Sequence, residues 1–318
     1  MRILVFGAGA IGSVLGGLLA KGGHDVTLLG RPWHLDVIRR QGLAITGIWG
    51  DHHVQRLTLA ASSAEMPREL PYDWVFVCVK AHQTADIAGA LPQWLGPRTL
   101  VCAFQNGLGN YETLIQHVAP ERIALGRVIF GVELEPGRAR VTVCADDVFI
   151  GAPDTRLPRA ALEGLAVALT AGGISTRTTD NIITVLWAKA LYNCALNGLS
   201  TLLEVPYGQL PADAQARRIM EAVVEEAYQV AAAKAVALEP PTAEAYRTLL
   251  FTRLIPATAA HQSSMLQDVR RGKPTEIEAL NGALARMGRE ASVSTPMNDL
   301  VTRLVHAKEQ FAGAARNP

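Results

Sequence analysis

The chain has 318 residues, of which 49% are hydrophobic and 19% charged, and 30 basic against 29 acidic residues leave a formal net charge of +1. One hydrophobic core rarely grows to this size, so two domains are expected. The charge balance argues against a nucleic-acid-binding surface. The four cysteines form no CxxC pair and are expected to be reduced core thiols, and no metal site is expected.

The apolar start of the chain does not resemble a targeting segment. Glycines interrupt residues 3–12, and only Arg2 supplies a preceding charge. We count no other stretch that reaches the roughly 18 apolar residues of a membrane span. A cytoplasmic protein without membrane contacts is therefore the expectation.

Short β-rich runs alternate with helical patterns from Arg2 to about Asp180. The runs are RILVF, DVTLL, WVFVCVK, TLVCAF, RIALGRVIF and RVTVCADDVFIG. Such alternation is typical of a mostly parallel sheet covered by helices. Because the later runs have fewer crossover helices, we expect the sheet to end in antiparallel pairs, with a hairpin around Asp146 and Asp147.

After Thr179 the sequence pattern changes from short β-rich runs to long helical patterns rich in Ala, Leu, Glu and Arg. The clearest are RRIMEAVVEEAYQVAAAKAVAL and residues 274–287. The sequence therefore predicts an α/β Rossmann-type domain with a mostly parallel sheet at residues 1–180 and an all-α domain at residues 181–318. The alanine-rich helices of the second domain also allow a homodimer interface.

A glycine-rich turn directly follows the first predicted strand. Gly7, Gly9 and Gly12 form the pattern GxGxxG between RILVF and a small-residue helix, which is typical of a dinucleotide-binding βαβ unit. Gly7 is expected to permit the tight turn, Gly9 to let the backbone approach a pyrophosphate, and Gly12 to bring helix and strand together. The expected diphosphate site comprises Gly7, Ala8, Gly9, Ala10, Ile11 and Gly12. The alternative is a glycine turn that binds no nucleotide.

The second strand, DVTLL, ends in Gly30 and Arg31. Enzymes that use NAD usually place an acidic residue here, against the ribose 2′-hydroxyl. A guanidinium complements a 2′-phosphate, which a carboxylate would repel. The sequence therefore predicts NADPH/NADP+ as the cofactor, and the alternative is that Arg31 is a solvated loop residue.

Two more polar residues follow apolar strands. Lys80 follows WVFVCV, and Asn106 with Gly107 follows TLVCAFQ. Ligands in open α/β sheets gather beyond the carboxyl ends of the strands. Both residues are therefore candidates for contact with the nicotinamide ribose or the substrate, although a surface lysine and a turn asparagine remain the alternatives.

A polar stripe crosses the first helix of the second domain. Lys189, Asn193 and Asn197 recur every four residues, which places their side chains on one face of an otherwise apolar helix. A buried ammonium flanked by amides indicates a catalytic acid. The alternatives are a lysine that reaches solvent along the helix surface and amides that bond to neighbouring loops.

A second polar cluster occurs in HQSSMLQDVRRGKPTEIEALNG, where Ser264 and Glu276 are candidates to face the site. Both also allow a structural interpretation. Ser263 and Ser264 would then form a helix start, and Glu276 would lie in the first turn of the helix after Pro274.

These motifs together resemble the ketopantoate reductase family, also called 2-dehydropantoate 2-reductases, over essentially the whole chain. The resemblance is carried by GAGAIG with Arg31, VKAHQT, QNGLG, LWAKALYNCALNGLS and SSMLQDVRRGKPTEIEALNG. It implies an N-terminal Rossmann domain and a helical C-terminal domain. It also implies NADPH-dependent reduction of a small 2-keto acid to the 2-hydroxy acid in pantothenate biosynthesis.

The resemblance implies a role for each matched residue. Lys189 would be the general acid that protonates the developing alkoxide, and Glu276 would support catalysis and bind the terminal hydroxyl of the substrate. A lysine suits this role because it can give up a proton, whereas an arginine keeps its proton. The remaining implied contacts are Asn193, Asn197 and Ser264 to the substrate, Lys80 and Asn106 to the nicotinamide and substrate region, and Arg31 to the 2′-phosphate.

The chain departs from the family pattern at His261. Some members place an asparagine there, three residues before the serine that matches Ser264. If His261 lines the pocket, the accepted 2-keto acid differs in its distal group; otherwise His261 is a surface residue. A paralogous NADPH-dependent reductase of another 2-keto acid is therefore an alternative. A separate alternative, from another class of function, is a non-catalytic NADP(H)-sensing regulator.

Overall fold

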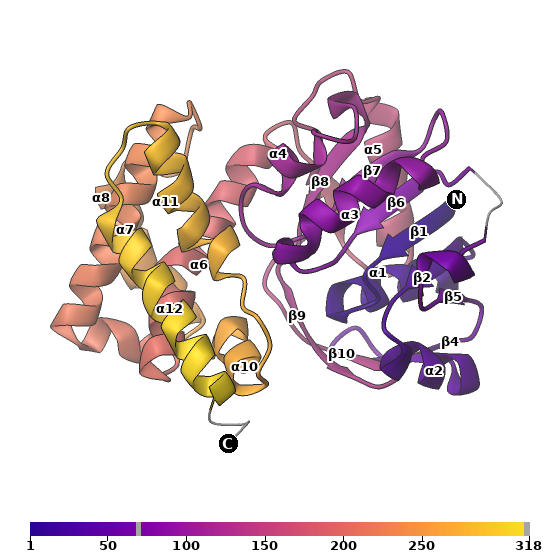
Figure 1. The fold of residues 1–318 in the computed structure, drawn as a ribbon, viewed down its shortest axis with the longest axis horizontal. Coiled ribbons are helices and arrows are strands. Elements are labelled where there is room, and N and C mark those ends of the chain that lie inside the picture. Colours follow the sequence, from indigo (N-terminus) through magenta and orange to yellow (C-terminus); the bar gives the residue numbers. More distant parts are fainter. Residues whose placement is uncertain (68–70, 315–318) are drawn as a thin grey trace. The chain divides into compact units, whose positions relative to one another are not determined.

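The structure is a computed structural model that describes residues 1–67 and 71–314 (Figure 1). The chain divides into two compact units. Unit 1 comprises Met1–Gln105 and Asn110–Ile182. Unit 2 comprises Asn106–Gly109 and the chain from Ile183 onward. A short loop that lies early in the sequence therefore belongs to the second unit.

Unit 1 is built on an eight-stranded sheet with the strand order β12-β11-β8-β7-β6-β1-β2-β5. Its neighbouring strands are parallel except for β8 and β11. The strands are β1 (Arg2–Phe6), β2 (Asp25–Leu29), β5 (Thr58–Ala60), β6 (Trp74–Val77), β7 (Leu100–Ala103), β8 (Ile123–Arg127), β11 (Val148–Gly151) and β12 (Thr176–Thr178). The mostly parallel sheet expected from the sequence is confirmed, and its central strands are buried because helices cover both faces.

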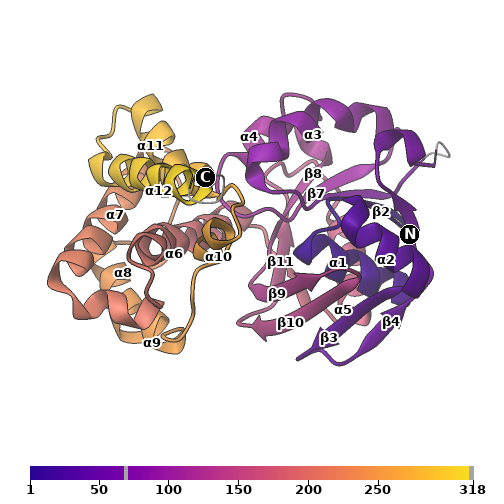
Figure 2. The ribbon, with the colours of Figure 1, turned by 60° about the horizontal axis from the view of Figure 1, so that its bottom comes forward.

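Helices cover the large sheet on both sides. Figure 2 shows α3 and α4 on one face, and α1 with a second sheet on the other. The helices of unit 1 are α1 (Ala10–Lys21), α2 (Pro32–Gln41), α3 (Thr84–Ala90), α4 (Asn110–Leu114) and α5 (Arg159–Ala171). Short 3-10 helices are η1 (Ser63–Glu65), η2 (Ala81–Gln83), η3 (Leu91–Trp94) and η4 (Pro120–Arg122).

The second sheet of unit 1 has the order β4-β3-β10-β9, formed by β3 (Leu43–Gly47), β4 (His52–Val54), β9 (Phe130–Glu135) and β10 (Arg138–Cys144). The hairpin predicted around Asp146 and Asp147 is wrong. The structure has a hairpin earlier in the chain, which joins β9 to β10 through Gly137, whose φ of +72° suits a tight turn. β11 instead joins the large sheet, and Asp146 accepts a 2.7 Å hydrogen bond from Arg127 where the chain crosses between the sheets. The expectation that the sheet ends in antiparallel pairs is confirmed only in part: β8 and β11 are antiparallel, but the sheet ends in the parallel pair β11 and β12.

Unit 2 is helical, which confirms the predicted all-α second part. Its longer helices are α6 (Ile182–Leu203), α7 (Ala214–Ala233), α11 (Asn281–Glu290) and α12 (Pro296–Ala314). The shorter elements are η5 (Tyr207–Ala212), α8 (Ala243–Leu249), the π-helical turn η6 (Leu250–Leu254), α9 (Ile255–Ala257), α10 (Ser264–Arg270) and η7 (Ile277–Ala279). Buried Glu226 of α7 accepts the backbone N–H groups of Met297 and Asn298 at the start of α12, which satisfies donors that a helix start leaves open.

Among the described residues, α6 is the one helix long and apolar enough to cross a membrane by length and composition alone. The helix is not a continuous apolar run, because Lys189, Asn193 and Asn197 interrupt it. Core helices pass the same test, and α6 is a core helix of unit 2 because Trp187, Leu191, Cys194 and Leu196 pack into the hydrophobic cluster of that unit.

All four cysteines are free thiols, as expected. Cys102 and Cys194 are buried, and Cys78 is half-buried. The expectation of a core position is wrong for Cys144, which lies exposed at the end of β10.

The contrast between two helical glycines gives a stability prediction. A Cβ atom at Gly12 of α1 would lie 2.1 Å from the carbonyl oxygen of Gly7, whereas a Cβ atom at Gly164 of α5 would meet no atom within 4 Å. Gly12→Ala should lower the free energy of unfolding by about 2 kcal/mol or more, because the backbone must shift. Gly164→Ala should raise it by about 0.5–1 kcal/mol, because alanine favours the helix.

Urea-induced unfolding of the two variants measures this difference. Equal effects at both positions would contradict the close packing of α1 against the glycine turn.

Candidate active site

The glycine turn of unit 1 is held between the ends of two strands. The backbone N–H groups of Gly7 and Ala8 donate to the Leu29 carbonyl oxygen at 3.0 and 2.8 Å. Gly7 has a φ of +102°, and a Cβ atom there would lie 2.8 Å from the backbone nitrogen of Val79. Glycine at position 7 is therefore required both by the backbone angle and by the close approach of the segment after β6.

The start of α1 is open on the side of Gly9. Gly9 precedes the helix, no side chain caps it, and a Cβ atom at Gly9 would meet nothing within 4 Å. The first N–H groups of a helix lack partners within the helix and favour an anion. The space beside Gly9 and the N–H groups of Ala10 and Ile11 thus fit a diphosphate.

Arg31 lies where the sequence analysis expects it, beside the glycine turn. It immediately precedes α2 in an extended conformation, and its side chain is exposed. A Cβ atom at neighbouring Gly30 would lie 2.6 Å from the Cβ atom of Ala8, so the end of β2 closely approaches the turn. The guanidinium of Arg31 forms no hydrogen bond or ion pair with the described residues, and it is available to an anion.

A buried polar network, which the sequence analysis does not identify, connects the ends of β6 and β7. The side-chain amide of Gln105 donates to the Val79 carbonyl oxygen at 3.1 Å and to the Thr84 hydroxyl at 2.8 Å. The Thr84 hydroxyl also lies 2.8 Å from Oδ1 of Asn110. These bonds fix the segment that carries Lys80, which is half-buried just before η2.

Three candidate residues meet in unit 2. The Nζ atom of half-buried Lys189 donates to Oδ1 of Asn106 at 2.6 Å. The Nδ2 atom of the same asparagine donates to Oε2 of Glu276 at 3.2 Å, and Glu276 is 8% exposed. One amide therefore joins an ammonium to a carboxylate, and the lysine does not simply extend into solvent.

The loop that carries Asn106 is held tightly against η7. The N–H group of Leu108 donates to the Ala279 carbonyl oxygen at 2.7 Å, and Gly107 has a φ of +85°. A Cβ atom at Gly107 would lie 2.4 Å from the same carbonyl oxygen. The close approach explains why glycine follows Asn106, and it sets Asn106 beside the segment of Glu276.

The polar stripe of α6 continues beyond Lys189. Asn193 is half-buried one turn later, and Asn197 is 5% exposed one turn after that. The hydroxyl of Tyr207 in η5 donates to Oδ1 of Asn197. Tyr207 is 3% exposed, and burial raises the pKa of its hydroxyl far above the usual range. This tyrosine therefore remains a neutral hydrogen-bond donor.

The two serines at the start of α10 have different environments. The buried Ser263 hydroxyl accepts the N–H group of Leu266 at 3.1 Å and lies 3.1 Å from the hydroxyl of Thr201 on α6. Ser264 is exposed at the first position of α10. Ser263 alone caps the helix, which leaves the Ser264 hydroxyl available to a ligand.

The chain matches two family models. Residues 3–155 match the model described as ketopantoate reductase PanE/ApbA, and residues 181–309 match the C-terminal model of the same family. The chain is 36% identical to a 2-dehydropantoate 2-reductase of Aquifex aeolicus over 98% of both chains. The chain belongs to the ketopantoate reductase family. It is also 32% identical to a 2-dehydropantoate 2-reductase of Halobacterium salinarum, over 98% of this chain and 99% of the relative.

Solved structures of similar proteins have the same fold. A PanE/ApbA family ketopantoate reductase from Ralstonia eutropha has a TM-score of 0.87 and 32% identity, covering 98% of this chain and 99% of that chain. A D-mandelate dehydrogenase solved with NADH and anilino(oxo)acetate has a TM-score of 0.86 and 29% identity, with the same coverage. The likeness therefore extends to an enzyme that is named for a different 2-hydroxy acid, mandelate.

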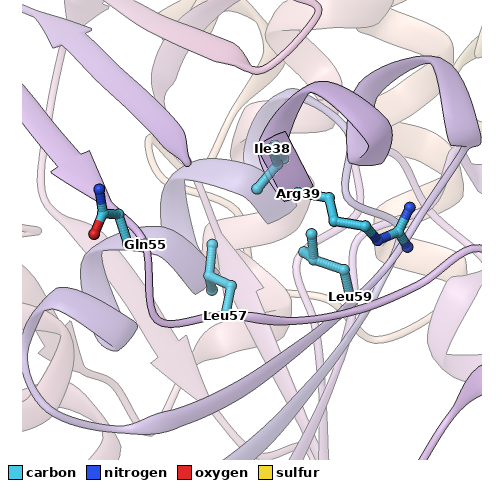
Figure 3. A pocket seen from close by; sticks show the side chains of 5 residues that line it. All are labelled: Ile38, Arg39, Gln55, Leu57 and Leu59. Atoms are coloured by element: carbon cyan, nitrogen blue, oxygen red, sulfur yellow. The ribbon is translucent and has the colours of Figure 1, made fainter. Parts of the chain in front are cut away.

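The candidate site residues belong to two groups, one within each unit. Lys189, Asn106 and Glu276 share hydrogen bonds in unit 2, whereas the glycine turn and Arg31 adjoin each other in unit 1. A shallow pocket of about 180 Å³ elsewhere in unit 1 contains none of them (Figure 3). It is lined by Ile38, Arg39, Gln55, Leu57 and Leu59.

His306 of α12 stabilises the segment that carries Glu276, and sequence patterns do not identify it. Its Nδ1 and Nε2 atoms lie 2.8 Å from carboxylate oxygens of Glu309 and Glu278. Glu309 also accepts the N–H group of Thr275 at 2.7 Å. Partial burial opposes the charged form of His306, but the two carboxylates outweigh it and raise its pKa above the usual value.

This raised pKa predicts a pH dependence of stability. A group whose pKa is higher in the folded state stabilises the fold fully below its unfolded pKa, about 6.5 for histidine, and loses that contribution as pH rises through the folded pKa. His306→Gln should therefore lower the free energy of unfolding at pH 6, with a smaller effect at pH 9. The effect should not exceed about 1 kcal/mol, because the ring is 41% exposed and solvent screens the pair.

Urea-induced unfolding at several pH values measures this effect. The control is His117→Gln, since exposed His117 is in no ion pair among the described residues and should show no such trend. A larger effect of His306→Gln at pH 9 than at pH 6 would reverse the predicted sign.

Proposed function

We propose that this protein reduces 2-dehydropantoate (ketopantoate) to pantoate with NADPH, as a step of pantothenate biosynthesis. Family membership over nearly the full chain and several relatives named 2-dehydropantoate 2-reductase support this reaction. The observation that carries the proposal is the bond from Lys189 to Asn106, with Glu276 on the other side of the same amide. An ammonium held in this way is suited to protonate an oxygen that becomes negative during a reaction.

The cofactor would lie along the carboxyl ends of β1 and β2. The open space at Gly9, the helix N–H groups of Ala10 and Ile11, and the guanidinium of Arg31 fit a dinucleotide with a 2′-phosphate. Gly7, Ala8 and Gly12 complete the turn. Bound NADPH supplies the hydride, whereas the residues of the chain orient it and hold the proton.

Lys189 would act as the general acid. Reduction of a ketone leaves negative charge on its oxygen, and the ammonium both stabilises that charge and supplies the proton. Asn106 accepts one N–H group of Lys189 and so fixes the position of Nζ. Glu276 holds the other end of this amide and would also bind the terminal hydroxyl of the substrate.

The remaining candidate residues would bind the rest of the substrate. Asn193 and Asn197 follow Lys189 along the same face of α6, and Ser264 has an exposed hydroxyl. We propose that these three residues hold the hydroxyl and carboxylate groups of the 2-keto acid. Lys80 and Asn106 would line the region where substrate and nicotinamide meet.

A second candidate function is reduction of another 2-keto acid. One structure similar to this chain is a D-mandelate dehydrogenase, and His261 packs with its ring centroid 5.1 Å from that of Tyr207. Steady-state kinetics over a panel of aliphatic and aromatic 2-keto acids distinguishes the two candidates by which acid has the highest kcat/KM. Turnover of any acid in the panel would exclude a purely NADP(H)-sensing regulator.

We further propose that the enzyme is cytoplasmic and acts on a small molecule, with neither nucleic acid nor membrane as a partner. Exposed Leu300, Leu304 and Phe311 on α12 support a homodimer, because a second copy of the chain would cover them.

Replacement of Lys189 tests the proposed mechanism. Lys189→Ala should lower kcat by roughly 10²- to 10⁴-fold, the usual range for a general acid. Lys189→Arg should also be severely impaired, because arginine keeps the charge but does not give up its proton. NADPH consumption in the presence of 2-dehydropantoate measures both effects.

The control is Lys234→Ala, which removes a lysine of unit 2 that pairs with Glu290 at 2.8 Å on the surface. Its kcat should stay within about twofold of the wild-type value, since surface pairs contribute little. A loss of less than about tenfold for Lys189→Ala would remove Lys189 from the role of general acid.

Replacement of Arg31 tests the choice of cofactor. Arg31→Ala should lower kcat/KM for NADPH by roughly 10- to 100-fold, the range of a charge-assisted hydrogen bond, and should leave the value for NADH nearly unchanged. Arg39→Ala is the control, because Arg39 lies on α2, the helix that follows Arg31, but pairs with Asp36 at 2.7 Å. A clear preference of the wild type for NADH would refute the assignment of NADPH.

A further inference from the structure

One hydrogen bond determines which atom of Asn197 is available to a ligand. The hydroxyl of Tyr207 donates to Oδ1 of Asn197, and both side chains are at least 95% buried. This carbonyl oxygen is the acceptor for the Tyr207 hydroxyl proton among the described residues. With the amide reversed, Nδ2 could donate to the hydroxyl oxygen, but the buried hydroxyl proton would then have no acceptor, which is unfavourable. The bond therefore distinguishes the two ends of the Asn197 amide.

The other end of the amide remains free. The Nδ2 atom of Asn197 makes no hydrogen bond to a described residue, and it is not among the fully enclosed polar atoms without a partner. Its N–H groups therefore keep access to solvent, although Asn197 as a whole is 5% exposed. Asn193 and Lys189 lie one and two helical turns earlier on the same face.

Tyr207 is itself fixed from two sides. Its ring makes an edge contact with Tyr192, with centroids 5.9 Å apart, and the Tyr192 hydroxyl lies 2.6 Å from that of Thr258. Its backbone N–H donates to the His261 carbonyl oxygen at 3.0 Å, and the rings of the two residues are 5.1 Å apart. The tyrosine hydroxyl consequently has little freedom to leave Asn197.

We propose that Tyr207 is a positioning residue that orients the Asn197 amide so that its N–H groups meet the carboxylate or hydroxyl oxygens of the 2-keto acid. This inference rests on the proposed function, which assigns the substrate to this face of α6. A carboxylate accepts hydrogen bonds and is repelled by a carbonyl oxygen, so a reversed amide would weaken binding. An amide fixed in advance also avoids the entropy cost of ordering it when the substrate binds.

His261 acts through the same tyrosine in this proposal. Its carbonyl oxygen and its ring both contact Tyr207. His261 is exposed, and partial desolvation where its ring packs on Tyr207 lowers the pKa of the ring below the usual histidine value. Any residue at position 261 would supply the carbonyl oxygen, so in this proposal the departure from the family pattern acts on the substrate through the ring contact with Tyr207.

Tyr207→Phe tests the proposal because it keeps the aromatic ring and removes only the hydroxyl. The KM for the 2-keto acid should rise about tenfold, the size expected of one neutral hydrogen bond. The KM for NADPH and kcat should stay within about twofold, because Lys189 and unit 1 are unchanged. The control is Tyr228→Phe, since the Tyr228 hydroxyl donates to the Pro240 carbonyl oxygen at 2.7 Å and should not affect the KM.

A double-mutant cycle with Asn197→Ala separates positioning from a general structural effect. If Tyr207 acts through Asn197, removing the hydroxyl in the Asn197→Ala background should change the KM by less than twofold. The same tenfold loss in both backgrounds would overturn the proposal, and so would an unchanged KM for Tyr207→Phe.

Asn197→Asp provides a second test that does not depend on the tyrosine variant. The aspartate still accepts from Tyr207, but it turns an oxygen instead of an N–H group toward the substrate. The KM should rise at least as much as in Asn197→Ala, and a wild-type KM would overturn the proposal. Thermal denaturation verifies that each variant is folded.

Failure of the inference differs from failure of the proposed function. If the wild type turns over no 2-keto acid in the panel and calorimetry detects no binding of pantoate, the proposed function fails and the inference fails with it. If the wild type turns over a 2-keto acid and the cycle is additive, only the role of Tyr207 is overturned.

Discussion

The site depends on a cation in a helix that is otherwise apolar. Lys189 lies on α6, whose neighbouring residues Trp187, Ala190 and Leu191 are buried in the core of unit 2. A charge partly removed from water must gain hydrogen bonds, or the protein loses the free energy of its solvation. Asn106 supplies that bond from 83 positions earlier in the sequence, and Glu276 holds the far end of the amide. The fold must therefore bring three distant segments together to keep one ammonium in place.

Local patterns predicted the parts of the site that local geometry determines. The four-residue spacing of Lys189, Asn193 and Asn197 is a property of one helix, and α6 spans all three. The positions of Gly7 and Gly12 follow from a turn between one strand and one helix, and both glycines have contacts that a side chain would block. The bond between Asn106 and Lys189 was not predictable in this way, because no periodicity relates a loop after β7 to a helix that begins at Ile182.

The difference between local and long-range contacts also explains why the hairpin predicted around Asp146 and Asp147 is wrong. The run RVTVCADDVFIG contains two β-rich halves around acidic residues, which is typical of a hairpin. The turn that is used lies earlier, at Gly137, and β10 also pairs in parallel with β3, about 90 residues before it. Strands β4, β5 and β12 have three residues each, too few for an alternating pattern to emerge from the sequence. Long-range pairing, not local propensity, decides these strands.

The residue type of an asparagine does not determine how its side-chain amide is oriented. Asparagine presents a donor and an acceptor of almost the same shape, so a sequence can specify Asn197 without specifying which end meets a ligand. The hydroxyl of Tyr207 decides between them, and the backbone and ring of His261 support that tyrosine. Replacing the ring at position 261 would therefore change the support of Tyr207, and with it the presentation of Asn197. Substrate preference within one family can thus change through the residues behind the binding groups while the binding groups stay the same.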